Sequence, residues 1–527
     1  MVVHGCQVWG VLVTDPRIRA AYAEGAGVYR IVPDAVAIPR DTAEVVALVQ
    51  HAAASGTTLI PRGAGSGMPG GNIGRGVIID MSAGFSALTV DSHSRSARAG
   101  ASVTWAGVNA AAKPYGLRLP PDPSSGLFAT CGGMVATNAA GPRSVRYGSV
   151  RRWVEGLEVV GAEGTVRTVK RAAGSGERVN LTPDIRRLIA ERFPRTPKSS
   201  SGYALDHFAE TGDEVDLLVG SEGTLAVITE VLWRLDPIPP HSAGAALGFG
   251  DLAAMAEAVR YLVSLQPSTL ELLDDTLLKF IPDAPAVACL LIVEFERETA
   301  AAARGVVGDA VRGLKHSLAQ VETAVDRAGL EKLWQVRRLA SPALARLPLP
   351  QRSLQVIEDG CVPVERLGEY VTGLRGAATR HGIPVAIFGH AGDGHVHVNA
   401  LPDITRPGWR DALRRLFDDV TDVLVRLGGV PSGEHGVGRL RAGVLERFYG
   451  REVMELFRNV KRAYDPLTIF NPGVIIPATD WSPLDALKVG DGAAAIPDDI
   501  ATRLRDVERS AAWATPKPEL ARQTPET

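Results

Sequence analysis

The stretch PRGAGSGMPGGN, residues 61–72, decides the fold of this chain. It follows Thr57–Ile60, a short run that predicts a strand, and it contains the spacing Gly65-x-Gly67-x-x-Gly70. A Rossmann fold needs a helix that opens inside this loop, but Pro69 and the glycines after it prevent one. Successive backbone N–H groups can still bind a pyrophosphate as an anion nest. The loop alone is equally compatible with a glycine-rich turn between two strands.

Two further glycine-rich stretches favour the phosphate-binding interpretation. The first, ATCGGMVATNAAGPRSVRYG, covers residues 129–148, and the second, LLVGSEGTLAVITEV, covers residues 217–231. Their small and hydroxyl side chains are too irregularly spaced for a packed core. Glycines such as Gly132, Gly133 and Gly141 would let a long flat ligand lie against bare backbone.

Composition excludes several classes of protein. The chain has 527 residues, a formal net charge of −2 and 45% hydrophobic residues, which predicts several domains and gives no basic surplus for nucleic acid. The 4 cysteines form no CxxC pair, so an internal iron–sulfur cluster or zinc ribbon is not expected. The few cysteines fit a reducing compartment, and no apolar run approaches the roughly 20 residues of a membrane helix. We therefore predict a cytoplasmic location. Peripheral attachment to the inner face of the membrane stays open.

The densest chemistry lies in FGHAGDGHVHVN, residues 388–399, which holds three histidines. Read as a turn followed by a strand, it places His395, His397 and Asn399 on one face, expected to border a cavity, with valines on the packed face. A second cluster, Gly433-Glu434-His435-Gly436, adds a carboxylate. Imidazoles with one carboxylate suit zinc or another divalent first-row metal that keeps a position open for substrate. Histidines with only hydrogen-bonding roles are the alternative.

Taken in order, these motifs resemble a known family over roughly residues 30–477. The three glycine-rich stretches are similar to the FAD-binding domain of vanillyl-alcohol-oxidase-type flavoproteins, and the whole chain resembles the FAD-linked D-2-hydroxyacid dehydrogenases of the D-lactate, glycolate and D-2-hydroxyglutarate types. The resemblance implies an α+β fold, with a FAD-binding domain of two α/β subdomains and an α/β cap domain that contains an antiparallel sheet.

A cluster of prolines near residue 237 suggests the boundary between these domains. We expect an N-terminal extension over 1–29, the FAD-binding domain over 30–237 and the substrate or cap domain over 238–430. A C-terminal segment over 431–477 would complete the active site and return to the FAD domain. The extension over 478–527 is expected to be partly mobile, with residues 515–527 as a mobile tail.

By resemblance, the cradle at residues 62–67 holds the pyrophosphate of FAD. Some relatives carry a flavin-linking histidine in the first loop, and Ser66 or a neighbouring small residue takes its place here, so FAD is expected to be non-covalent. The expected cofactor-binding residues are Pro61, Arg62, Gly63, Ala64, Gly65, Ser66, Gly67, Met68, Pro121, Ser125, Thr130, Gly132, Gly133, Asn138, Tyr147, Gly148, Glu222, Val227 and Asn471.

The resemblance also assigns roles in the second half of the chain. His390, His397 and Glu434 correspond to metal ligands. His435 corresponds to the active-site acid/base and Asn399 to a position that contacts substrate. Many relatives have Asn in place of His395, whose imidazole could join the metal or meet the flavin.

One arginine completes the expected catalytic set. The segment Trp334-Gln-Val-Arg337 is similar to the one whose Arg holds the substrate carboxylate, although an exposed basic helix turn is the alternative.

These assignments imply the FAD-dependent oxidation of a D-2-hydroxy acid, such as D-lactate or glycolate, to the 2-oxo acid. Ile357 stands where relatives specific for 2-hydroxyglutarate have Lys, which weakens the case for a second substrate carboxylate. Three alternatives stay open: a D-2-hydroxyglutarate dehydrogenase, a non-redox flavoenzyme like the alkyl-dihydroxyacetone-phosphate synthases, and a flavin-carrying electron-transfer subunit. A metal-dependent hydrolase would not explain the three flavin-like motifs.

The electron acceptor is expected to lie outside the chain, because Trp481–Thr527 contains no cysteine for an iron–sulfur cluster. A cytochrome, a quinone, an electron-transfer flavoprotein or a separate iron–sulfur protein would serve. We expect a small 2-hydroxy acid as substrate and neither nucleic acid nor a transmembrane segment, and a homodimer stays open.

Overall fold

The structure, a computed structural model, describes residues 12–172, 178–347 and 350–522. Its first sheet has the order β1-β2-β4-β3, in which β2, β4 and β3 run parallel. The strands are β1 (Leu12–Val13), β2 (Ala35–Ala37), β3 (Leu59–Arg62) and β4 (Val77–Asp80). The strand expected before the glycine-rich loop is thus confirmed as β3.

Helix α2 (Thr42–Ser55) packs against this first sheet. It begins after Asp41, whose carboxylate caps it by accepting a hydrogen bond of 2.9 Å from the Glu44 N–H. It ends at Gly56, whose φ of 73° favours glycine. Local capping signals therefore place the helix that precedes β3.

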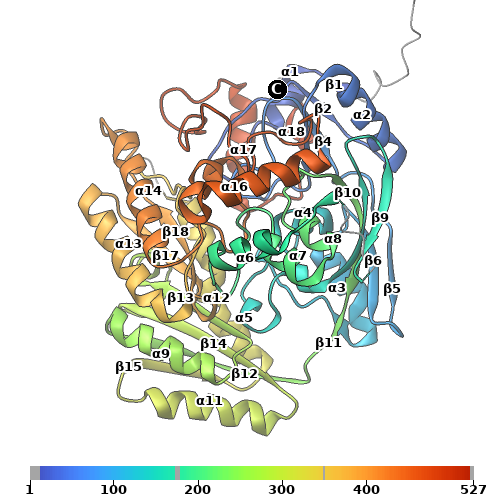
Figure 1. Cartoon of the computed structure of the whole chain (residues 1–527). Helices are drawn as coiled ribbons and strands as arrows, with labels where there is room; N and C mark the ends of the chain where they lie inside the picture. Colours follow the sequence, from blue (N-terminus) through green and yellow to red (C-terminus); the bar gives the residue numbers. More distant parts are fainter. Residues whose placement is uncertain (1–11, 173–177, 348–349, 523–527) are drawn as a thin grey trace, which may run out of the picture.

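The second sheet is antiparallel, with the order β5-β6-β10-β8-β9 (Figure 1). Helices α3 (Trp105–Ala112) and α4 (Cys131–Thr137) contribute to its core. Together the first two sheets form the two α/β subdomains that the sequence predicts. The strands are β5 (Leu88–Asp91), β6 (Ser96–Gly100), β8 (Val154–Val160), β9 (Val166–Lys170) and β10 (Val227–Arg234).

The third sheet is also antiparallel, with the order β15-β12-β14-β13-β17-β18-β16. One face packs against α9 (Leu252–Ser264), α11 (Ala300–Leu314), α13 (Leu367–His381) and α14 (Trp409–Arg426), and the other packs against α12 (Arg327–Ala345). This sheet confirms the expected cap domain. The strands are β12 (His241–Phe249), β13 (Thr269–Asp274), β14 (Cys289–Arg297), β15 (Leu318–Ala324), β16 (Gly360–Cys361), β17 (Val385–His390) and β18 (His395–Ala400).

After the third sheet the chain returns to the first half of the molecule. Helix α16 (Leu445–Tyr464) buries Tyr449 and Phe457 in the core that contains the second sheet. In Figure 1 it lies above α6 (Pro183–Arg192) and α7 (Leu205–Thr211), on the opposite side of the molecule from α11. None of the described helices combines the length and hydropathy needed to span a bilayer.

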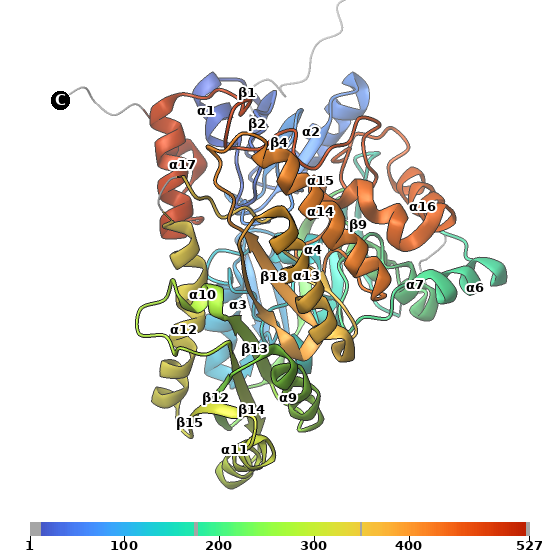
Figure 2. The same cartoon turned by 90° about the vertical axis from the view of Figure 1, so that its left-hand side faces the viewer.

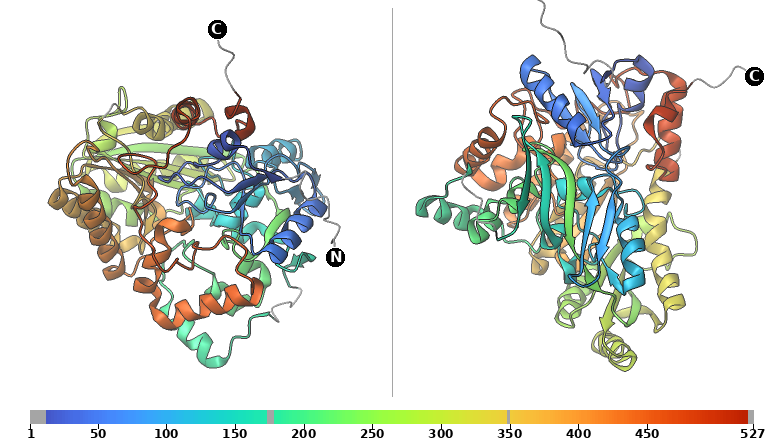
Figure 3. Two further views of the ribbon diagram at one scale, coloured as in Figure 1. Left: turned by 90° about the horizontal axis from the view of Figure 1, so that it is seen from above. Right: turned by 90° about the vertical axis from the view of Figure 1, so that its right-hand side faces the viewer.

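The C-terminal segment packs along one side of the molecule. Helix α17 (Asp498–Ser510) contacts both α1 (Pro16–Ala21) and α12, and Figures 2 and 3 show it directly above α12. The stretch expected as a mobile tail contains α18 (Lys517–Leu520), which packs against α1. Residues 523–527 of that stretch lie outside the described residues. The segment therefore joins the first subdomain to the cap domain.

We predict that this C-terminal packing contributes to the stability of the whole chain. Leu504 on α17 is 2% exposed in a cluster with Ile500, Val507 and Trp513. Leu504→Ala should cost about 2–5 kcal/mol and lower the melting temperature, because it leaves a cavity. The matched control is Asp506→Ala on the exposed side of the same helix, measured by the same thermal melt. Equal melting temperatures for the two variants would contradict the prediction.

Candidate functional site

A cavity of about 1550 Å³ is lined by segments from all three sheets. The end of β3 and the loop after it, residues 61–69, form one wall, and residues of the 122–143 stretch form another. The cap domain contributes α12 and the ends of β17 and β18. The cavity exceeds the usual range of about 300–1,000 Å³ for ligand sites, so it has room for a long cofactor together with a small substrate.

The loop after β3 is held from behind by the N-terminal segment. The buried Arg62 guanidinium donates to the carbonyl oxygens of Tyr22 and Glu24, at 3.1 and 2.8 Å. A Cβ atom on Gly27 would overlap the Met68 carbonyl oxygen, so only glycine lets this segment approach the loop. The expected cofactor residues that line the cavity are Pro61, Arg62, Gly63, Ala64, Gly65, Ser66, Gly67, Met68, Ser125, Thr130, Gly132, Gly133 and Glu222.

The other expected cofactor residues do not line the cavity. Two of them hold neighbouring segments in place. The Asn471 amide donates to the carbonyl oxygens of Gly71 and Glu222 at 2.7 and 2.9 Å, and the Tyr147 hydroxyl donates to the Glu296 carboxylate at 2.5 Å. The full set away from the cavity is Pro121, Asn138, Tyr147, Gly148, Val227 and Asn471.

Glu222 connects the cradle to the second histidine cluster. Its carboxylate accepts hydrogen bonds from the backbone N–H groups of Val437 and Gly438, at 2.7 and 2.8 Å. Burial raises the pKa of this carboxyl to about 7, against the opposing effect of these two donors. The side chain therefore fixes the backbone just after His435 at the edge of the cavity.

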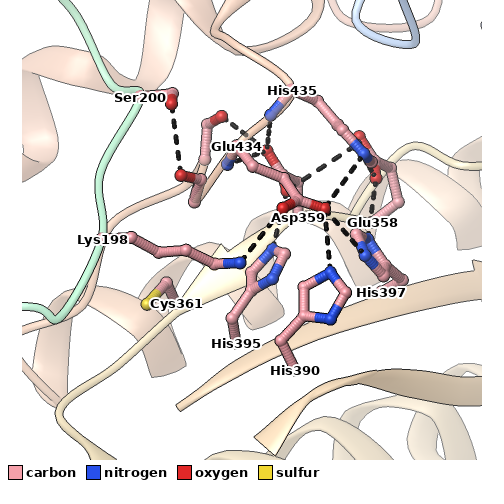
Figure 4. Close-up of polar contacts among 12 residues, drawn as sticks. Lys198, Ser200, Glu358, Asp359, Cys361, His390, His395, His397, Glu434 and His435 are labelled. Atoms are coloured by element: carbon pink, nitrogen blue, oxygen red, sulfur yellow. Dashed lines mark hydrogen bonds and ion pairs between the residues drawn. The ribbon is translucent and has the colours of Figure 1, made fainter. Parts of the chain in front are cut away.

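His390 of β17 and His397 of β18 converge on one carboxylate oxygen of Glu434 (Figure 4). Glu434 Oε1 lies 3.1 Å from His390 Nε2 and 3.2 Å from His397 Nε2. The other oxygen, Oε2, accepts from Lys198 Nζ at 3.1 Å and from the Gly141 N–H at 2.8 Å. The structure thus brings together the three residues expected to bind metal.

Each of these two imidazoles has a second carboxylate behind it. His390 Nδ1 lies 2.5 Å from Glu271 Oε1, and His397 Nδ1 lies 3.6 Å from Glu358 Oε2. Burial alone would raise the pKa of Glu271, but His390 and Arg337 outweigh it and lower that pKa to about 2. Carboxylates of this kind orient metal-binding imidazoles and raise their basicity.

His435 lies at the cavity, next to the predicted metal ligands. Its ring stacks on that of His397 with centroids 4.9 Å apart, and its Nδ1 lies 2.7 Å from Glu358 Oε2. Burial alone would lower the pKa of His435, but the carboxylates of Glu358 and Asp359 outweigh it and raise the pKa to about 10. With Nδ1 held by Glu358, Nε2 is the nitrogen left for proton exchange.

Arg337 and Asn399 also line this cavity. Arg337 Nε donates to Glu271 Oε2 at 2.7 Å, and its guanidinium lies over the Phe388 ring. Within the described part of the chain no hydrogen bond occupies its two terminal nitrogens, which suits them to a carboxylate ligand. Asn399 Oδ1 accepts from the Ser353 hydroxyl at 2.9 Å.

Sequence reasoning missed three charged residues that support this site. Lys198 compensates the buried Glu434, Glu271 lies behind His390, and Arg441 pairs with Glu358. None carries a motif of its own, and each acts through a partner more than 80 residues away in the sequence. Sequence spacing offers no signal for such contacts.

Comparison with known proteins shows which family this chain resembles. Residues 33–170 match the FAD binding domain, and residues 238–475 match the C-terminal domain of FAD linked oxidases. The D-lactate dehydrogenase of Archaeoglobus fulgidus is 31% identical over 83% of this chain and 90% of its own length. The chain belongs to the FAD-linked D-2-hydroxyacid dehydrogenase family.

Other members of the family differ in length. The glycolate oxidase subunit GlcD of Bacillus subtilis is 29% identical over 84% of this chain and 89% of its own length. The D-2-hydroxyglutarate dehydrogenase of Pantoea ananatis is 29% identical over 93% of this chain. This chain spans only 52% of that relative.

The fold of this family member also occurs in an alkyldihydroxyacetonephosphate synthase. That structure has a TM-score of 0.62 and 19% sequence identity, and the match covers 88% of this chain and 82% of the other. The likeness confirms the fold alone.

The residues present fit FAD, the cofactor that the family match indicates. The cradle at 62–67 offers a glycine-rich backbone against which a pyrophosphate would fit, and the cavity has the required size. The donor set of three buried histidines and Glu434, with ligand atoms all within 4.8 Å of one another, also fits a divalent metal. The identity of that metal belongs to the proposals below.

We predict that FAD retention depends on the glycine behind the cradle. Gly27→Ala should displace the Met68 carbonyl and lower the flavin content of the purified protein, because the loop can no longer hold its position. The ratio of flavin to protein absorbance measures this. Gly305→Ala is the matched control, since a Cβ atom there meets open space. Full flavin content in the Gly27 variant would refute the proposed cradle.

Proposed function

We propose that this protein oxidises a D-2-hydroxy acid to the corresponding 2-oxo acid, with non-covalent FAD as the hydride acceptor. The observation that carries the proposal is that one cavity is lined by the glycine-rich cradle, by Arg337 and by the His397/Glu434/His435 group. Relatives named D-lactate dehydrogenase and glycolate oxidase subunit support the same class of substrate.

When bound, FAD supplies the hydride acceptor, and a divalent cation, with zinc as the leading candidate, supplies a Lewis acid that makes a substrate hydroxyl more acidic. His390 and His397 would hold the cation through Nε2, and Glu434 would hold it through Oε1. Lys198 and the Gly141 N–H keep the other oxygen of Glu434 in place. The carboxylate therefore presents one oxygen to the site.

Arg337 orients the substrate in this proposal. Glu271 holds Nε, so the guanidinium keeps a defined plane while its two terminal nitrogens are available for the substrate carboxylate. Asn399, on the same face of β18 as His397, contributes a polar contact on the cavity wall.

His435 takes the hydroxyl proton at Nε2. Hydrogen bonding of Nδ1 to Glu358 selects the tautomer in which Nε2 carries the lone pair. The same carboxylate stabilises the imidazolium that forms. A cation bound by Glu434 would place a positive charge close to His435. That charge would lower the raised pKa of His435 toward the neutral range, where a base is effective.

The electrons would leave the flavin for an external acceptor such as a cytochrome, a quinone, an electron-transfer flavoprotein or an iron–sulfur protein. A D-2-hydroxyglutarate dehydrogenase is the second candidate, because relatives with that name match most of this chain. A non-redox reaction like that of the synthase with the same fold is less well supported, since the His/Glu cluster and the dehydrogenase relatives favour oxidation. We further propose a cytoplasmic location and leave a homodimer and peripheral membrane attachment as hypotheses.

The first test is anaerobic reduction of the flavin by a panel of 2-hydroxy acids. D-lactate, glycolate or D-2-hydroxyglutarate should bleach the flavin absorbance, and the L isomers should not, because the cradle, Arg337 and His435 fix one face of the substrate. The acid that reduces the flavin fastest distinguishes the two candidates, a small acid such as D-lactate or glycolate and the dicarboxylate D-2-hydroxyglutarate. No bleaching by any member of the panel would overturn the proposed oxidation.

Arg337 should determine substrate affinity. Arg337→Met should weaken the binding of the reducing acid by about 10–100-fold, because a hydrogen-bonded charge contributes roughly 1.5–3 kcal/mol. The concentration dependence of flavin reduction measures this. Arg338→Met is the matched control, since the neighbouring side chain is exposed and paired with Glu331. Equal effects of the two changes would remove Arg337 from this role.

His435 should determine the rate of flavin reduction. His435→Gln should slow it by about 10²–10⁴-fold while the FAD content stays unchanged, because a positioned base contributes rate enhancement of that size. Stopped-flow absorbance measures the rate. A variant that reduces its flavin at the normal rate would exclude His435 as the base.

The metal-free protein should also lose stability as the pH rises. The pKa of His435 in the folded protein is about 10, above its ordinary value of 6.5, so its contribution is complete below pH 6.5 and disappears as the pH passes 10. After chelation, the difference in melting temperature between the wild type and His435→Gln should shrink from pH 6 to pH 10. A difference that grows with pH would contradict this.

A further inference from the structure

His395 lies in the same buried group as the predicted metal ligands. One potential ligand atom from each of His390, His395, His397 and Glu434 lies within 4.8 Å of the other three. The ring centroid of His395 is 5.3 Å from that of His390 and 4.7 Å from that of His397. The three imidazoles therefore form a compact triangle.

One nitrogen of His395 is already engaged. Its Nε2 lies 2.7 Å from Asp359 Oδ1, and the other oxygen of Asp359 accepts from the Ser432 hydroxyl at 2.5 Å and the His435 N–H at 2.9 Å. Asp359 is fully buried, and its two carboxylate oxygens together meet these three donors. Since this carboxylate accepts, Nε2 of His395 is the donating nitrogen of the pair, and Nδ1 carries the lone pair.

That second nitrogen has no partner. Among the described residues, His395 Nδ1 is a buried polar atom without a hydrogen bond, and the residue is 0% exposed. Leaving a buried polar nitrogen without a partner is destabilising. A ligand that accepts its lone pair would remove that cost, and no proton donor fills the role within the described part of the chain.

We propose that His395 Nδ1 is a third imidazole ligand of the metal, in addition to His390, His397 and Glu434. The proposal rests on the metal site of the proposed function and extends its ligand set. Behind each imidazole lies a carboxylate on the opposite ring nitrogen: Glu271 for His390, Asp359 for His395 and Glu358 for His397. A repeated carboxylate–histidine arrangement of this kind is typical of metal ligands.

The added imidazole should change the selectivity of the site. Three nitrogens and one oxygen favour zinc, cobalt(II) or nickel(II) over manganese(II) or magnesium(II), which prefer oxygen ligands. A site with two imidazoles and one carboxylate discriminates less. His395 would therefore determine which metal the protein holds, while His435 and Arg337 remain available to the substrate.

The first experiment counts the ligands in the wild type. The flavin-loaded full chain is stripped with a chelator and reloaded with one equivalent of zinc, and X-ray absorption spectroscopy then counts the imidazoles bound to zinc. Three imidazoles are expected. Two imidazoles would overturn the proposal without any variant, so the outcome does not depend on the folding of a mutant.

The second experiment compares His395→Asn with the control His381→Asn. His381, at the end of α13, pairs with Asp419 of α14 at 2.9 Å and belongs to neither potential metal group of the described residues, so it is a His–Asp pair outside the site. Zinc affinity, measured by competition with a chromophoric chelator, should fall at least about tenfold in His395→Asn, with a much smaller change for manganese(II). The visible spectrum of the cobalt(II) form should also change. Wild-type zinc affinity together with an unchanged cobalt spectrum would refute the proposal.

These measurements use no substrate, so they separate this inference from the proposed function. Three imidazoles on zinc without flavin bleaching by any 2-hydroxy acid would refute the dehydrogenase activity alone. Two imidazoles with normal bleaching would refute the role of His395 alone. A wild-type protein that binds no divalent metal would refute both the metal in the proposed function and this inference.

Discussion

The buried carboxylates around the histidines impose the constraint on which the rest of the site depends. Glu271, Glu358, Asp359 and Glu434 are each at most 7% exposed, and an isolated charge at such depth would be strongly destabilising. Each has a cationic or polar partner from another part of the chain: Arg337 from α12, Arg441 from α15 (Gly438–Arg441) and Lys198 from the loop before α7. Neutralising these charges requires that the segments meet, so the electrostatics of the site and the assembly of the domains are one problem.

The assembly explains why the active site is shared between domains. Glu434 accepts from Lys198 and the Gly141 N–H in the first half of the chain, and its other oxygen faces imidazoles of the cap domain. Glu222 in turn holds the backbone after His435. Neither half holds the cluster alone, and the glycine-rich loop after β3 and the histidine cluster are therefore fixed relative to each other by hydrogen bonds rather than by one rigid sheet.

Local patterns were enough to predict the elements that carry the chemistry. Asp41 and Gly56 mark the ends of α2, the glycine-rich loop follows β3, and alternation puts His395, His397 and Asn399 on one face of β18. The same reasoning was weaker for residues recognised by family position. Asn471 and Tyr147, for example, do not line the cavity but hydrogen-bond to the Gly71 carbonyl and the Glu296 carboxylate. A motif identifies a residue without showing where its side chain points.

The sequence by itself located the cradle loop and the two histidine clusters, because these depend on period, glycine placement and spacing within about a dozen residues. The class of fold followed from the resemblance of these motifs to a known family. Only the tertiary structure decided which side chains pair with these residues. Glu271 pairs with His390, Lys198 with Glu434 and Asp359 with His395. Such pairs join residues 36 to 236 positions apart, and no local rule relates them. The free nitrogen of His395 follows from those partners, since the described structure engages its Nε2 with Asp359 and leaves the buried Nδ1 without a hydrogen bond.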